Sequence, residues 1–180
     1  MIKLQEMISR TLFLESKKLR IFDFDDTLVK TNSYIYVTHT NGKTSKLTPG
    51  QYAVYKEKSG DTFNFDDFQD VKDPSEIKQI TKVIKQIEKK SSGDLFILTA
   101  RAASLPIKNY LNDIGIKRAE VIALGSNNPQ DKADWIENKI DNEGYTDIYF
   151  ADDSPKNVEV TKRMLRNKNG IKWRVQHIKH

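Results

Sequence analysis

Short apolar segments alternate along this chain with longer amphipathic segments, and this alternation constrains the fold more than any other feature. Four segments have the length of a β-strand and are bounded by polar residues: 19–24, 94–99, 120–124 and 147–151. Within them apolar residues run together instead of alternating with polar ones, which is typical of parallel strands covered on both faces. The chain therefore predicts a sheet buried between helices.

A helix is expected before the second strand. Asp73-Pro74-Ser75-Glu76 offers an N-cap, a proline at the first helical position and a glutamate at the third. Isoleucines follow at helical spacing, at positions 77, 80, 84 and 87. Gly93, soon after two lysines, is expected to end this helix.

Further amphipathic segments follow the second and third strands. Residues 102–114 and 130–142 predict helices stopped by glycines, and Ser154-Pro155 starts another helix after the fourth strand. Strand–helix alternation of this kind predicts an α/β, Rossmann-like fold with a mostly parallel sheet flanked by helices. The length of 180 residues fits one domain, residues 1–180.

Residues 31–72 break this rhythm between the first strand and the first helix. Asn41-Gly42 lies between the β-prone runs 34–38 and 44–47, which predicts a hairpin. Pro49 is expected to start a short helix, and an acidic loop follows. We expect this segment to form a small cap or flap inserted into the domain.

Composition excludes several kinds of site. The chain has no cysteine, which excludes disulfides, thiolate metal sites and cysteine nucleophiles, and only three histidines. No apolar run approaches the ~20 residues of a membrane span. Residues 1–18 mix charges among apolar residues and lack the apolar core of a signal peptide. A cytoplasmic protein that does not contact membranes is expected.

The C-terminal segment 156–180 is basic. It carries a net charge of +7 and leaves residues 1–155 at −2, with eight cationic side chains: Lys156, Lys162, Arg163, Arg166, Lys168, Lys172, Arg174 and Lys179. Such a segment can attract a polyanion or an anionic substrate. The alternative is a solvated helix face with no partner.

Polar side chains follow all four strands. They are Asp23 and Asp25 after the first, Thr99, Ala100 and Arg101 after the second, Ser126, Asn127 and then Lys132 after the third, and Asp152 and Asp153 after the fourth. Ligands in open α/β sheets bind beyond the carboxyl ends of the strands, so these groups are expected to lie together.

Clustered carboxylates repel one another unless a cation lies between them. Mg²⁺ takes oxygen ligands and commonly binds one or two carboxylates together with a phosphate, so the cluster predicts Mg²⁺ and a phosphoryl group. Asp23 and Asp25 are two residues apart and point the same way in an extended segment, so one can attack phosphorus while the other moves protons. Taken singly, these residues are equally typical of a surface turn, a helix cap or a solvated lysine; their shared place at strand ends favours one metal–phosphate site.

The motifs resemble those of the haloacid dehalogenase (HAD) superfamily of phosphohydrolases over roughly residues 18–165. A strand followed by Asp-x-Asp-x-Thr matches residues 21–28, and a strand ending in threonine matches 96–99. Lys132 near a helix start matches the third motif, and a strand followed by paired acids matches 148–153. Lys108 and Lys117 are alternatives for the third motif. Asp26 stands where the family often has glycine, which permits a positive φ, a conformation that aspartate tolerates better than most residues.

The resemblance implies a role for each matched residue. Asp23 would be the nucleophile, and Asp25 would protonate the leaving oxygen and then activate water. Thr99 and Lys132 would hold the phosphoryl oxygens. Mg²⁺ would be held by Asp23, the backbone carbonyl of Asp25, Asp152 and Asp153. The expected activity is Mg²⁺-dependent hydrolysis of phosphate monoesters through an aspartyl-phosphate.

The small insert suggests an open site that admits either a small molecule or the end of a polymer. Arg101 is expected to grip a substrate phosphate, together with Thr99 and Ala100. The pattern is similar to the phosphatase half of polynucleotide kinase/phosphatase enzymes, which implies a nucleic-acid terminal phosphate. A phosphometabolite or a nucleotide is at least as strong a candidate substrate, and a phosphoprotein is a third. Gly42-Lys43-Thr44 resembles only the end of a P-loop, because Val37 stands where the first glycine belongs, so a kinase is not expected.

Two other classes of protein fit part of the pattern. A receiver domain also combines acids, a threonine and a lysine on an α/β sheet, and would be a phosphoacceptor binding module. The Asp23-x-Asp25 spacing on the first strand disfavours it, because a receiver accepts phosphate on a middle strand. A catalytically inactive HAD scaffold is the other class, and the presence of every catalytic residue type disfavours it.

Overall fold

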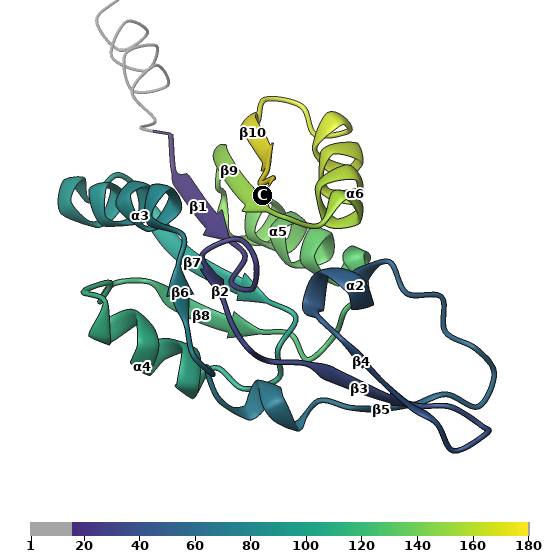
Figure 1. The fold of residues 1–180 in the computed structure, drawn as a ribbon. Helices are drawn as coiled ribbons and strands as arrows, with labels where there is room; N and C mark the ends of the chain where they lie inside the picture. The colour runs from purple at the N-terminus through teal and green to yellow at the C-terminus, as the bar shows by residue number, and fades with distance from the viewer. Residues whose placement is uncertain (1–15, 180) are drawn as a thin grey trace, which may run out of the picture.

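A five-stranded parallel sheet forms the centre of the molecule in the computed structural model, which describes residues 16–179 (Figure 1). Its strand order is β10-β9-β1-β7-β8. The strands are β1 (Lys18–Phe22), β7 (Asp94–Thr99), β8 (Glu120–Ala123), β9 (Asp147–Asp152) and β10 (Lys172–His177). The expected α/β architecture with a parallel, Rossmann-like sheet is confirmed.

Helices cover both faces of this sheet. On one face α3 (Lys78–Lys90) and α4 (Leu105–Asp113) pack on Phe22 and Ile97, and on the other face α5 (Pro129–Glu143) and α6 (Pro155–Arg166) pack on Ile21 and Phe96. Neighbouring residues of a strand point to opposite faces, so Ile21 and Phe22 of β1 are both buried, each against a different layer of helices. The uninterrupted apolar runs of the sequence follow from this arrangement.

Residues 31–72 form a separate small layer beside the carboxyl edge of the sheet (Figure 1). The expected hairpin is confirmed: β3 (Ile35–Thr38) pairs antiparallel with β4 (Thr44–Leu47), and Gly42 adopts φ 78° in the turn. A third strand that the sequence did not predict, β5 (Thr62–Asn64), pairs with the other edge of β3. The expected short helix is α2 (Pro49–Ala53), and a 3-10 helix, η1 (Asp66–Gln69), follows β5.

The predicted start of α3 is wrong. Glu76 belongs to a two-residue strand, β6 (Ser75–Glu76), which pairs with β2 (Val29–Lys30), and the Ile77 N–H donates to the Leu28 carbonyl at 2.9 Å. This pairing holds the chain extended, so the helix begins only at Lys78 and has no side-chain cap. The capping pattern at 73–76 therefore does not cap a helix.

The basic C-terminal segment also differs from a single solvated helix face. Its first part is α6, and its second part is β10, which pairs with β9 from Lys172 to His177. Within residues 16–179, no helix combines the length and the apolar character needed to cross a membrane.

Candidate active site

The carboxyl ends of three adjacent strands bring the predicted site residues together. Asp23 follows β1, Thr99 ends β7 and Asp152 ends β9, and β1 lies between the other two strands. The Asp23 N–H donates to the Ala151 carbonyl at 2.9 Å, which continues the β1–β9 pairing up to the site. Asp26 then turns the chain away from the sheet with φ 54°, the left-handed conformation that favours glycine at this position.

Three carboxylates lie close together at this edge. Asp23, Asp152 and Asp153 each offer an oxygen within 4.8 Å of the others. The Lys132 ammonium, on the first turns of α5, bonds the Asp23 carboxylate at 2.6 Å and the Asp152 carboxylate at 2.8 Å. Asp23, Asp152 and Lys132 are all buried. A single lysine thus lies among three acids, so the group has a net charge of −2 when all three acids are ionised.

Burial and mutual repulsion shift the pKa values of these groups. Burial raises the pKa of Asp23 well above its ordinary value, Lys132 opposes that shift, and Asp152 and Asp153 add to it. Burial, together with the charges of Asp152 and Asp26, raises the pKa of Asp153 to about 7. Burial also works to lower the pKa of Lys132, but the charges of Asp152 and Asp23 outweigh it, so the pKa is raised and the ammonium keeps its proton.

Two side chains that the sequence did not single out orient these acids. The buried Thr27 hydroxyl accepts the Asp153 N–H at 3.0 Å and lies 3.3 Å from the Asp153 carboxylate. The Asn157 amide donates to both oxygens of Asp152, at 3.1 and 3.0 Å. Thr27 is the last residue of the Asp-x-Asp-x-Thr motif, so spacing could have identified it; Asn157 lies on α6 and only the fold brings it to Asp152.

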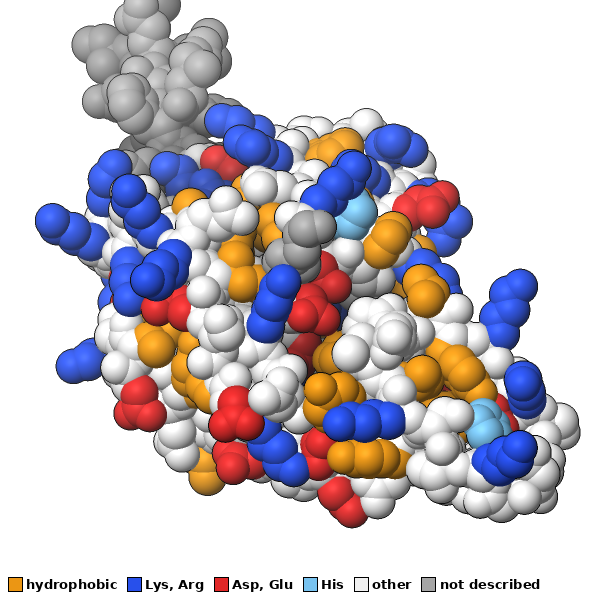
Figure 2. Space-filling view, viewed as in Figure 1, with side chains coloured by type: hydrophobic (Ala, Val, Ile, Leu, Met, Phe, Trp, Pro, Cys, Tyr) orange, Lys and Arg blue, Asp and Glu red, His pale blue; other side chains and the backbone are white. Residues whose placement is uncertain are grey.

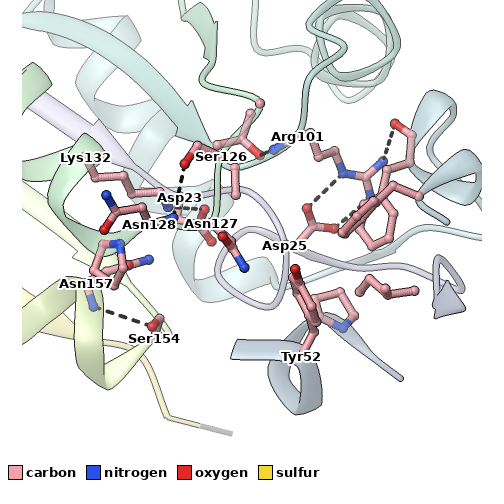
Figure 3. A pocket seen from close by; sticks show the side chains of 18 of the residues that line it. Asp23, Asp25, Tyr52, Arg101, Ser126, Asn127, Asn128, Lys132, Ser154 and Asn157 are labelled. Atoms are coloured by element: carbon pink, nitrogen blue, oxygen red, sulfur yellow. Dashed lines mark hydrogen bonds and ion pairs between the residues drawn. The ribbon is translucent and has the colours of Figure 1, made fainter. Parts of the chain in front are cut away.

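Asp25 faces a different partner. Its carboxylate accepts hydrogen bonds from Nε and Nη2 of Arg101 at 2.8 and 2.7 Å (Figure 3). Two bonds to the two oxygens fix the orientation of the carboxylate. The Arg101 Nη1 atom donates to the Asp70 carbonyl at 2.6 Å, and the guanidinium lies 4.7 Å from the Phe68 ring centre. Arg101 therefore ties residues 68–70 to the sheet. We expected the Arg101 guanidinium to bind a substrate phosphate, and in the structure it binds the Asp25 carboxylate instead.

The other expected residues divide between the site and the remote surface. Thr99 and Ala100 line the same pocket as Asp23, and the Thr99 hydroxyl accepts the Arg101 N–H at 3.1 Å. Lys108, one alternative to Lys132, donates instead to the carbonyls of Lys117 and Ala119 on the loop before β8. Of the three candidate lysines, Lys132 is therefore the one that contacts Asp23.

A pocket of about 670 Å³ opens over these groups. Asp23, Asp25, Thr99 and Lys132 line it, together with the loop after β8 and part of residues 31–72. Figure 3 shows Tyr52 rising from α2. In the space-filling view acidic side chains gather near the middle of the face shown, between lysine and arginine side chains (Figure 2). The volume suits a ligand of nucleotide size.

The donor set fits a hard divalent cation. All three donors are carboxylates, which Mg²⁺ prefers, and two of them are buried beside only one lysine. A divalent ion would compensate the two negative charges that Lys132 leaves. The carboxylate of Asp25 points to Arg101, so of Asp25 only the backbone carbonyl stays a predicted ligand.

Comparison of the chain with protein-family models, with curated proteins and with solved structures finds no significant match. Function is therefore inferred from the site itself.

Proposed function

We propose that this protein is a Mg²⁺-dependent phosphatase that hydrolyses phosphate monoesters through an aspartyl-phosphate on Asp23. Its substrate is a phosphometabolite, a nucleotide or a nucleic-acid terminal phosphate. One observation carries the proposal: the Asp23 carboxylate lies at the base of a pocket, bonded to Lys132 and beside two further acids, with Asp25 lining the same pocket. The sequence motifs that supply these residues resemble those of the HAD superfamily, in which residues 31–72 would be a small cap.

Asp23, Asp152 and Asp153 would hold Mg²⁺, which would neutralise charge on the transferring phosphoryl group. In the first step an oxygen of Asp23 forms a bond to phosphorus while the bond from phosphorus to the leaving oxygen breaks. Asp25 gives that oxygen a proton. Lys132 and the Thr99 hydroxyl hold phosphoryl oxygens at the base of the pocket.

In the second step a water molecule loses its proton to Asp25 and attacks phosphorus. Inorganic phosphate leaves, and the Asp23 carboxylate is restored. Arg101 binds both oxygens of the ionised Asp25 carboxylate and so fixes the orientation of the form that takes the proton from the attacking water. Positioned groups and fixed charges of this kind supply most of the acceleration of phosphoryl transfer.

Phosphate release from p-nitrophenyl phosphate tests the proposal. We expect turnover with Mg²⁺, none in excess EDTA, and a loss of activity in Asp23→Asn. Asp113→Asn is the matched control because this exposed carboxylate on α4 lies outside the pocket. Turnover in EDTA would contradict the metal role, and a stable phosphorylated protein without phosphate release would favour a phosphoacceptor module.

A further inference from the structure

The proposed chemistry uses only one end of the pocket, and an aromatic surface forms another side of it. We call this surface the aromatic wall; it consists of Tyr52, Tyr55, Phe65 and Phe68, all from residues 31–72. The Tyr52 and Phe65 rings meet edge to face with centres 5.5 Å apart, and the Phe65 and Phe68 centres are 6.4 Å apart. Phe63 stacks behind Phe65 at 6.3 Å and supports it.

The aromatic wall keeps apolar surface in contact with solvent. Phe65 is 42% exposed although it lies in a cluster of rings that can bury apolar surface. An exposed aromatic surface that lines a cavity is typical of a ligand site, and a flat ring gains stacking energy on such side chains whatever its substituents.

The loop after β8 supplies polar groups to the same pocket. Ser126, Asn127 and Asn128 all line it. The Asn128 amide caps α5 through the Gln130 N–H at 3.2 Å, so it is already committed. The Ser126 hydroxyl accepts the Asn128 N–H at 3.2 Å and keeps its own proton to donate to a ligand. A ligand here would meet rings on one side and a hydroxyl donor on another.

The charge of the pocket disfavours a polymer. Its cationic lining residues are Arg101, Lys132 and Lys156, of which Arg101 is paired with Asp25 and Lys132 with Asp23 and Asp152. Residues 31–72 add an acid, Glu57, and no lysine or arginine to the described lining. Binding of a nucleic-acid strand needs cations that follow several phosphates, whereas a mononucleotide needs charge compensation at one phosphate only.

We propose that the substrate is a free nucleoside monophosphate whose base stacks on the aromatic wall while its phosphate lies at Asp23. The inference rests on the proposed phosphatase function and narrows its substrate. The two steps given above then release the nucleoside, with its oxygen protonated by Asp25, followed by inorganic phosphate.

Hydrolysis of adenosine 5′-monophosphate and of ribose 5-phosphate compares the same phosphate with and without a base. We expect kcat/KM to be about 5- to 150-fold higher for the nucleotide, the range given by stacking of one base. Phe65→Ala should remove most of this preference by lowering kcat/KM for the nucleotide. Val54→Ala is the control, because Val54 is in the same segment, is 63% exposed and does not line the pocket.

Equal kcat/KM for the two esters would overturn the inference, as would a preference for a 5′-phosphorylated oligonucleotide over the mononucleotide. Calorimetric binding of adenosine 5′-monophosphate to Asp23→Asn separates this result from a failure of the proposed reaction. The inference is supported, even if no ester is hydrolysed, when two results hold together. Adding Phe65→Ala to Asp23→Asn weakens nucleotide binding, and adding Val54→Ala to Asp23→Asn does not. The inference is contradicted if Asp23→Asn does not bind the nucleotide, or if adding Phe65→Ala leaves the affinity unchanged.

Discussion

Replacing Lys132 with methionine removes the cation that two buried carboxylates share. The Lys132 ammonium lies 2.6 Å from Asp23 and 2.8 Å from Asp152, and its side chain is 4% exposed. Methionine fills a similar volume without the charge, so the change leaves buried acids unpaired instead of opening a cavity. Removing one partner of a buried ion pair costs about 3–5 kcal/mol of unfolding free energy.

For a protein of this size 1 kcal/mol shifts Tm by about 2–4 °C, so we expect Tm of Lys132→Met to fall by roughly 6–20 °C in EDTA. Mg²⁺ should recover part of this loss, because it binds the folded carboxylates and not the unfolded chain. Activity should fall by about 10²–10³-fold, as when a preorganised charge-stabilising donor is lost. Thermal unfolding with and without Mg²⁺ measures the effect, and the exposed Lys82 on α3, replaced by methionine, is the control. An unchanged Tm in EDTA would refute the charge imbalance that underlies the site.

Thr27→Val should lower the unfolding free energy, measured in urea, by about 1–3 kcal/mol, because it leaves the Asp153 N–H without its acceptor at 3.0 Å. Thr27→Ser keeps a hydroxyl and should retain most of the unfolding free energy. Equal losses in the two variants would contradict a role of this hydrogen bond in stability. Mg²⁺ affinity, measured by calorimetry, should fall roughly tenfold per pH unit below about 7, because the raised pKa of Asp153 means that the ion must displace a proton there. Constant affinity across that range would show that Asp153 is not a ligand. Gly93→Ala should lower the unfolding free energy by at least about 1–3 kcal/mol, since Gly93 adopts φ 125° and an added Cβ would lie 2.8 Å from the Lys18 carbonyl oxygen. Gly170→Ala, with φ 73° and open space around it, should cost less in the same urea titration.

The sequence predicted the elements that are determined by local pattern. The four buried strands and the hairpin at Asn41-Gly42 follow from apolar runs and turn residues, and the structure contains them. The start of α3 was wrong because pairing of Glu76 with Val29, far along the chain, overrides the capping residues before it. The edge strand β10 was missed because Lys172 and Arg174 interrupt its apolar residues, and only its place beside β9 makes it a strand.

The site divides in the same way. Asp23, Thr99, Lys132 and Asp152 lie together because parallel strands end at one edge, which strand order in the sequence already implies. The partner of Asp25 was not predicted. Arg101 has the chemistry to bind a phosphate or a carboxylate, and only the three-dimensional arrangement, with Asp25 at 2.7 Å, shows which one it binds here.

Mass spectrometry of the chemically quenched Asp25→Asn variant, after mixing with Mg²⁺ and p-nitrophenyl phosphate, whose phenolate leaves without a proton from Asp25, tests the nucleophile directly. Asparagine cannot take the proton from the attacking water, so the second step should stall and the peptide that contains Asp23 should carry one phosphoryl group. Adding Asp23→Asn should abolish that modification. Phosphate release without any phosphorylated intermediate, or a phosphoryl group on a different residue, would contradict the account.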